Sequence, residues 1–237
     1  MNPVAEVRAF VRAALVDPVP RDHQESDEAF RRRRWVVGIT LVVGAAVLGW
    51  ALRIEPGDRL FYVATIALAG VWALGAVLSG PLHLGRARTR TGSTESRAVV
   101  QSLALGGLLL ALFLAGALVV AHIPFLREPV DELLDHAQAG SLSLVAVITA
   151  INAVAEELYF RGALYAGVGR KHGVLVTTVV YTLVCAAAGI PLLVLAAAIL
   201  GLVVGLQRRV TGGILGPTIT HLTWSLGMLF LLPLVLS

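Results

Sequence analysis

Cysteine and charge are the scarcest features of this 237-residue sequence. The single cysteine, Cys185, excludes an intrachain disulfide. Charged residues make up 14% of the chain and hydrophobic residues 57%, a balance that excludes an ordinary soluble domain and indicates several membrane spans. The sequence shows no phosphate-cradling glycine loop, no obvious internal repeat and no basic stripe interleaved with aromatic residues. Its net charge of +4 therefore does not indicate a nucleic acid partner.

Seven apolar runs predict an all-α multi-span membrane protein with about seven transmembrane helices. The expected spans are residues 35–52, 60–79, 99–121, 141–168, 173–188, 191–206 and 213–236. The fifth and sixth are short for the ~20 residues that a spanning helix needs. We divide the chain into a basic N-terminal segment (1–34), three N-terminal helices (35–122) and a four-helix core (141–237).

The distribution of basic residues predicts the orientation of these helices. Fifteen of the 19 lysines and arginines precede the first run or follow the second, fourth and sixth runs. The opposite loops hold Arg53, Arg59 and Arg127, together with an acidic group that consists of Glu128, Asp131, Glu132 and Asp135. The positive-inside rule then gives a plasma-membrane protein with a cytoplasmic N-terminus and an outer C-terminus, whose first partner is the lipid bilayer. Residues 4–15 have the spacing of an interfacial helix, and residues 17–28 are expected to be a polar connector without chemistry.

Two adjacent glutamates inside the fourth apolar run indicate where chemistry is to be sought. A carboxylate in a membrane helix costs at least ~2.5–3.5 kcal/mol on insertion scales, so it normally has a partner or a function. Glu157 and Arg161 are i,i+4 neighbours and are expected to pair, which leaves Glu156 as the freer carboxylate and a candidate general base. Asn152 lies one turn earlier on the face of Glu156.

Two later spans each carry polar residues on one face. These are Thr178, Tyr181 and Cys185 in the fifth span, and Thr218, His221 and Ser225 in the seventh. At ~1.5 Å per residue, Glu157, Cys185 and His221 all lie about 12–18 Å from the cytoplasmic ends of their helices, so one site between the helices is expected. Each residue also has a simpler interpretation: the Glu157–Arg161 pair as a structural ion pair, His221 as an interhelical hydrogen-bonding residue, and Cys185 as a small packing residue.

These polar groups, in this order, resemble the motifs of the CPBP family of CAAX prenyl proteases and bacteriocin-processing enzymes. Residues 156–162 read Glu-Glu-Leu-Tyr-Phe-Arg-Gly and match the first family motif in full. The resemblance covers roughly residues 141–230, and it implies an intramembrane endopeptidase that hydrolyses peptide bonds. It further implies that Glu156 activates a water, that His221 is a metal ligand or an oxyanion donor, and that Glu157 and Arg161 hold the site together.

Two motifs depart from the family pattern. Tyr181 and Cys185 stand where the family has phenylalanine and histidine, and Ser225 stands where it has asparagine or aspartate. A cysteine thiolate is a good zinc ligand, so the resemblance implies a possible zinc ion held by Glu156, Cys185 and His221. Tyr181, Ser225 and Asn152 are expected as supporting residues.

Three functions follow from this sequence. The first is a CAAX protease-like metallo- or glutamate-dependent endopeptidase, with a peptide or a membrane protein as substrate. The second is a catalytically degenerate relative, a pseudoenzyme that binds peptides or membrane proteins in the same cleft, because Cys185 and Ser225 replace family residues. The third is a proton- or ion-coupled transporter that uses Glu156, Glu157 and Arg161 as a relay. Neither the substrate nor the oligomeric state follows from the sequence.

Overall fold

The computed structural model describes residues 3–21, 23–54, 58–88, 93, 96–138 and 141–236. Within these residues the β structure consists of an isolated antiparallel bridge between Ala87 and Ser96, and the named elements are helices. In order they are α1 (Pro3–Val11), η1 (Arg12–Val16), α2 (Asp27–Ala51), α3 (Arg59–Ser79), α4 (Val99–Val120), α5 (Pro124–Gln138), α6 (Leu142–Glu156), η2 (Glu157–Leu164), α7 (Tyr165–Val168), α8 (Gly173–Ala186), α9 (Pro191–Thr211) and α10 (Leu215–Leu236). The elements η1 and η2 are π-helical.

The all-α, multi-span fold predicted from the sequence is confirmed. Six helices of the described chain are long and apolar enough to cross a membrane: α2, α3, α4, the continuous Leu142–Val168 segment, α9 and α10. The fifth predicted span corresponds to α8, which is 14 residues long and falls short of that length. The sixth span was predicted too short, because α9 continues past residue 206 to Thr211.

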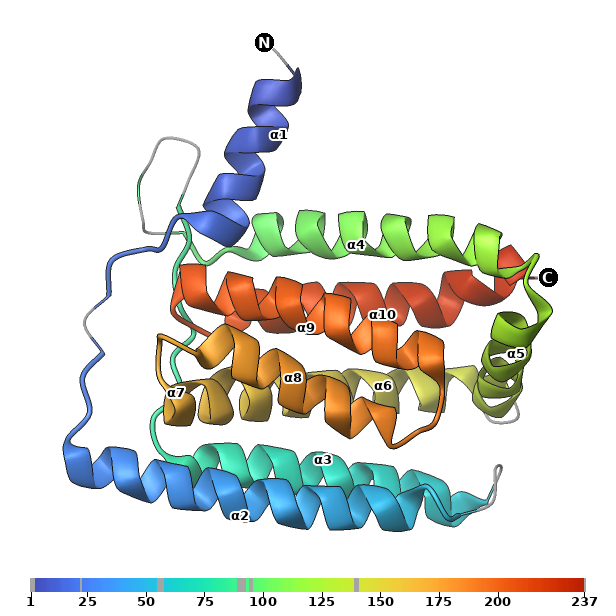
Figure 1. Cartoon of the computed structure of the whole chain (residues 1–237), viewed down its shortest axis with the longest axis horizontal. Coiled ribbons are helices and arrows are strands. Elements are labelled where there is room, and N and C mark those ends of the chain that lie inside the picture. The colour runs from blue at the N-terminus through green and yellow to red at the C-terminus, as the bar shows by residue number, and fades with distance from the viewer. Residues whose placement is uncertain are drawn as a thin grey trace.

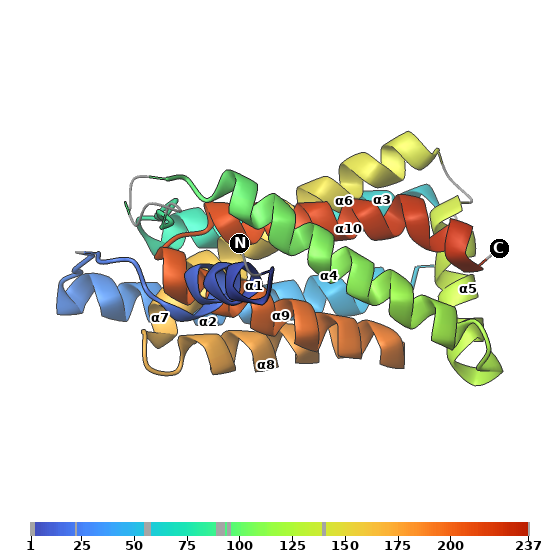
Figure 2. The same cartoon turned by 90° about the horizontal axis from the view of Figure 1, so that it is seen from above.

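The long helices run side by side, with α4 along α10, α8 along α9 and α2 along α3 (Figure 1). The segment that carries the glutamates, α6 with η2, packs against α3 on one side and α10 on the other. Seen from above, α4 crosses over α10 at an angle (Figure 2). The glutamate motif therefore lies inside the bundle, with helices from both halves of the chain around it.

Aromatic side chains of η2 form the centre of the core. Tyr159 and Phe160 are fully buried, and both pack on Trp72 of α3 with ring centroids 4.6 and 5.4 Å away. The Tyr159 hydroxyl donates a 2.8 Å hydrogen bond to the main-chain oxygen of Val37 in α2. These contacts fix the position of η2 relative to the N-terminal helices.

Two segments outside the spans differ in how well they were predicted. The helix expected over residues 4–15 is present as α1 and η1, and η1 packs on α9 through the buried Ala14. Helix α5, with a proline at its first residue and another inside it, was not predicted and was interpreted as an acidic loop. Arg90, and the side chains of Asp131, Glu132 and Asp135, lie outside the described residues.

A close approach of two backbone segments joins the loop after α3 to the start of α10. The main-chain nitrogens of Ile214 and Leu215 donate to the main-chain oxygens of His83 and Leu84. A Cβ atom added to Gly213 would lie 2.0 Å from the main-chain nitrogen of Gly85 and 2.0 Å from the carbonyl carbon of Leu84. Only a glycine fits between these segments, because neither backbone can move without losing the hydrogen bonds.

We expect Gly213→Ala to destabilise the protein by about 1–3 kcal/mol, because the added methyl group overpacks a backbone contact. The measurement is the thermal midpoint of the full chain in detergent. The matched control is Gly38→Ala in α2, where nothing lies within 4 Å of the added carbon and the higher helix propensity of alanine is neutral or stabilising. Equal midpoints for the two variants would contradict the close approach.

Candidate active site

The glutamate motif lies at a change of helix type. α6 ends at Glu156, and the π-helical η2 begins at Glu157 and extends to Leu164. Short π-helical segments inside α-helices occur often at functional sites, because the wider turn changes the direction of the side chains. The sequence predicted one continuous span here, so the boundary between the two glutamates is a new feature of the site.

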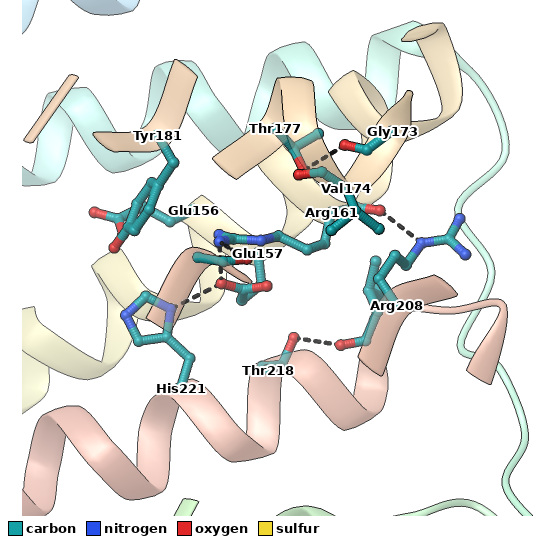
Figure 3. Close-up of polar contacts among 12 residues, drawn as sticks. Glu156, Glu157, Arg161, Gly173, Val174, Thr177, Tyr181, Arg208, Thr218 and His221 are labelled. Atoms are coloured by element: carbon teal, nitrogen blue, oxygen red, sulfur yellow. Dashed lines mark hydrogen bonds and ion pairs between the residues drawn. The ribbon is translucent and has the colours of Figure 1, made fainter. Parts of the chain in front are cut away.

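Glu157 is the buried centre of the site. Its side chain has no exposed surface, and its Oε1 atom accepts hydrogen bonds from Arg161 Nη1 at 2.8 Å and from His221 Nδ1 at 2.9 Å. Figure 3 shows Glu157 between these two partners. The i,i+4 ion pair predicted from the sequence is present, and His221 joins it from α10.

Arg161 is also fully buried and is held by contacts beyond its carboxylate partner. Its Nη2 atom donates to the main-chain oxygen of Gly201 in α9 at 3.4 Å. Its guanidinium carbon lies 4.6 Å from the ring centroid of Tyr181 in α8, a cation–π distance. A buried ion pair needs such additional partners, because the desolvation of both charges otherwise exceeds their mutual attraction.

Glu156 lies in a different environment from its neighbour. It is partly exposed, and its Oε2 atom accepts a 2.8 Å hydrogen bond from the Tyr181 hydroxyl. In Figure 3 its carboxylate is turned toward Tyr181 and away from the Glu157 pair. The two adjacent carboxylates therefore have separate partners: Glu157 is tied to two cationic or potentially cationic groups, and Glu156 to one neutral hydroxyl.

The contact with Glu157 fixes the role of each ring nitrogen of His221. A carboxylate can only accept a hydrogen bond, so Nδ1 of His221 carries a hydrogen and donates a hydrogen bond to Glu157. In the neutral ring Nε2 then has a free lone pair, which can accept a proton or bind a metal. An oxyanion donor at Nε2 requires the doubly protonated ring.

The other residues predicted for the site either hydrogen-bond within their own helix or are only partly buried. Asn152 donates from Nδ2 to the main-chain oxygen of Ile148, one turn back in its own helix, and Thr218 likewise donates to Ile214. Cys185 is partly buried, one turn beyond Tyr181 in α8, and Ser225 is partly buried, one turn beyond His221 in α10. The roles expected for these residues stay predictions.

A zinc ion does not fit the donors as they are arranged. Throughout the described part of the chain, no three His, Cys, Asp or Glu side chains are grouped so that they could hold a metal ion. The donor set of Glu156, Cys185 and His221 would need side-chain movement to converge. Zinc stays a prediction from the resemblance, and no step below passes through it.

Two residues of the site were not expected from the sequence. Arg208 of α9, 7% exposed, donates from Nε to the main-chain oxygen of Arg161 at 2.7 Å (Figure 3). Trp224 packs 6.4 Å from the His221 ring and 5.2 Å from Phe113 of α4. Arg208 was counted only for membrane orientation, although its place in an apolar helix was a signal that it had a partner.

An apolar cavity opens beside the site. It has a volume of about 500 Å³ and lies between α3, α6 and α10. Its lining includes Ala155 and Leu222, the sequence neighbours of Glu156 and His221, and every lining residue is apolar or glycine. The cavity is therefore an apolar recess lined by the residues next to Glu156 and His221 in the sequence, and neither Glu156 nor His221 lines it.

Comparison with known proteins supports the resemblance predicted from the sequence. Residues 138–227 match the family model of the Rce1-like type II CAAX prenyl endopeptidases. The match covers the glutamate motif, α8, α9 and the part of α10 that carries His221. No curated protein and no solved structure matches the chain.

Proposed function

From the similarity of residues 138–227 to type II CAAX prenyl endopeptidases, we propose that this multi-pass membrane protein is an intramembrane endopeptidase in which Glu156 activates water. The observation that carries the proposal is the division of labour between the two glutamates. Glu157 is buried and committed to Arg161 and His221, whereas Glu156 is partly exposed and has a single neutral partner. A general base needs this second environment, because it must reach water and exchange a proton.

In the proposed reaction Glu156 takes a proton from a water molecule while the water oxygen attacks the scissile carbonyl carbon. The tetrahedral intermediate then breaks its carbon–nitrogen bond, and the proton returns from Glu156 to the departing amine. The Tyr181 hydroxyl orients the Glu156 carboxylate through its hydrogen bond. Glu157 and Arg161 hold His221 in place, as they hold the helices that carry the base.

The substrate is proposed to be a peptide or membrane protein with an apolar attachment. In this proposal the apolar group occupies the cavity between α3, α6 and α10, whose lining includes Ala155, and the peptide bond lies next to Glu156. We further propose that the end with the basic loops faces the cytoplasm, which puts the N-terminus inside and the C-terminus outside the plasma membrane.

The test is hydrolysis of a quenched fluorescent peptide that ends in a prenylated CAAX sequence, with the full chain in proteoliposomes. We expect the wild-type protein to release fluorescence and product analysis to show one new peptide terminus. Empty liposomes and the unprenylated peptide are the controls. Intact prenylated peptide after incubation with folded protein would overturn the enzymatic proposal.

A second function, a peptide binder without catalysis, is favoured by one observation. Cys185 and Ser225 replace family residues, and the donors near them form no metal site within the described chain. We expect the double variant Cys185→His, Ser225→Asn to hydrolyse the prenylated peptide no more than about tenfold faster than wild type if the natural site is active. A gain of ~10³-fold or more would show that the natural site is degenerate.

A further inference from the structure

A second cavity lies at the end of the bundle where α2 begins and α9 ends (left in Figure 1). It has a volume of about 270 Å³ and is formed by the connector before α2, the start of α2, the loop after α3, η2, α7 and the end of α9. The charged and histidine residues in its lining are Arg21, His23, Glu25, Asp27, Arg33, His83, Arg170 and Arg208. It thus differs from the apolar cavity between α3, α6 and α10.

Positive charge dominates this cavity. Four arginines and two carboxylates line it. One of the carboxylates, Glu25, forms an ion pair with Arg33, which donates a hydrogen bond to each of its two oxygens. The lining then has three further positive charges and one further negative charge. The positive charges are those of Arg21, Arg170 and Arg208, and the negative charge is that of Asp27. Arginine clusters of this kind match the geometry and charge of phosphate oxygens.

The arginines and histidines of the cavity also repel one another. Burial, followed by the charge of Arg170, lowers the pKa of Arg21 from its ordinary value. The pKa of His83 is lowered first by burial and then by His23, Arg208 and Arg33, while Glu25 acts in the opposite direction. The rings of His23 and His83 stack at 3.6 Å, so these like groups are held together by the fold. An anion in the cavity would relieve the repulsion among these arginines and histidines.

Two buried donors of the cavity lining have no partner within the described chain. The Tyr165 hydroxyl is one of them, on a side chain that is 3% exposed and packs 4.9 Å below the Arg208 guanidinium. The other is Nε of Arg21, whose Nη atoms donate to the main-chain oxygens of Arg208 and Arg209 at the end of α9. An unpaired buried donor costs about 1–3 kcal/mol, so both donors favour an acceptor in the cavity.

We propose that this cavity is a binding site for a phosphate group, held by Arg21, Arg170 and Arg208 with the Tyr165 hydroxyl. The phosphate belongs either to a lipid headgroup or to a soluble phosphate. A basic pocket between helices at the end with the basic loops is the place where anionic headgroups bind membrane proteins. None of these residues hydrogen-bonds Glu156 in the described structure, so binding to the site can be tested without measuring hydrolysis.

Arg208 connects this site to the glutamate motif. Arg208 uses Nε to bind the main-chain oxygen of Arg161, and Figure 3 shows the rest of its guanidinium directed away from the glutamates. A bound phosphate would hold Arg208, and through it the η2 backbone, in one position. Occupancy of the cavity therefore stabilises the segment on which Glu157 and Arg161 lie.

The test uses the full chain in detergent with two probes. The first is retention of phosphatidic acid against phosphatidylcholine, measured by native mass spectrometry. The second is the thermal midpoint in inorganic phosphate against chloride at equal ionic strength. Arg21→Gln is expected to weaken binding about tenfold and Tyr165→Phe about fivefold. Arg170→Gln, whose side chain is exposed, is expected to weaken it roughly threefold without affecting folding.

The matched control is Arg31→Gln, an exposed arginine of α2 at the same end of the bundle and outside the cavity lining. Phosphatidic acid retention that the three variants weaken and Arg31→Gln preserves supports a lipid headgroup. A phosphate-dependent midpoint with the same pattern, without lipid retention, supports a soluble phosphate. Equal losses in Arg31→Gln and Arg170→Gln, or no response to either probe, would overturn the site.

Discussion

Glu156→Gln is expected to lower the rate of peptide hydrolysis by roughly 10²–10⁴-fold, the usual contribution of a general base. Glutamine keeps an oxygen that can accept the hydrogen bond from Tyr181, so the local geometry is preserved. It cannot take a proton from water, and it lacks the negative charge of Glu156. The expected loss is therefore in kcat, with little change in the thermal midpoint.

The measurement is cleavage of the quenched prenylated peptide by wild type and variant in proteoliposomes at equal protein. Glu28→Gln, an exposed carboxylate at the start of α2, is the control and should retain full activity. Undiminished hydrolysis by a folded Glu156→Gln protein would assign the general base to another residue. Loss of folding together with activity would mean that Glu156 is structural.

The second large effect is expected from Glu157→Ala, which should destabilise the protein by about 3–5 kcal/mol. The substitution leaves the guanidinium of Arg161 fully buried without its carboxylate, and it removes the acceptor of His221. Arg161→Ala should cost a similar amount, because Glu157 then becomes the uncompensated charge. The measurement is the free energy of unfolding in detergent with increasing denaturant.

The control is the exposed ion pair between Arg12 and Asp17, whose side chains are 62% and 38% exposed. Asp17→Ala there should cost about 0–1 kcal/mol, because water and salt already screen the pair. The double variant Glu157→Leu, Arg161→Met should be more stable than either single truncation, since no buried charge is left alone. A double variant as unstable as the sum of its parts would contradict a direct ion pair.

Local contacts of the site could be predicted from the sequence, and distant ones could not. The Glu157–Arg161 pair follows from helix period alone, and it is present at 2.8 Å. The contacts of Tyr181 with Glu156 and of His221 with Glu157 depend on how each helix is rotated about its axis. Hydropathy does not fix that rotation here, because the faces toward lipid and toward the bundle are both apolar.

Two other features were hidden for different reasons. The π-helix from Glu157 to Leu164 leaves the composition of the span unchanged, so its boundary has no sequence signal of its own. The connector of residues 17–28 was interpreted as a polar linker without chemistry. Its Arg21 and His23 become part of a cavity only when α9 and the loop after α3 are folded against it.

The short length of α8 has a consequence for the lipid around it. Fourteen residues at 1.5 Å each make a helix about 21 Å long, whereas the hydrocarbon layer of a bilayer is about 30 Å thick. A bilayer adapts to such a mismatch by thinning locally. Because Tyr181 and Cys185 lie in the last two turns of α8, thinning around this helix would occur beside the glutamate site. Water would then have a shorter hydrophobic barrier to cross before it reached Glu156.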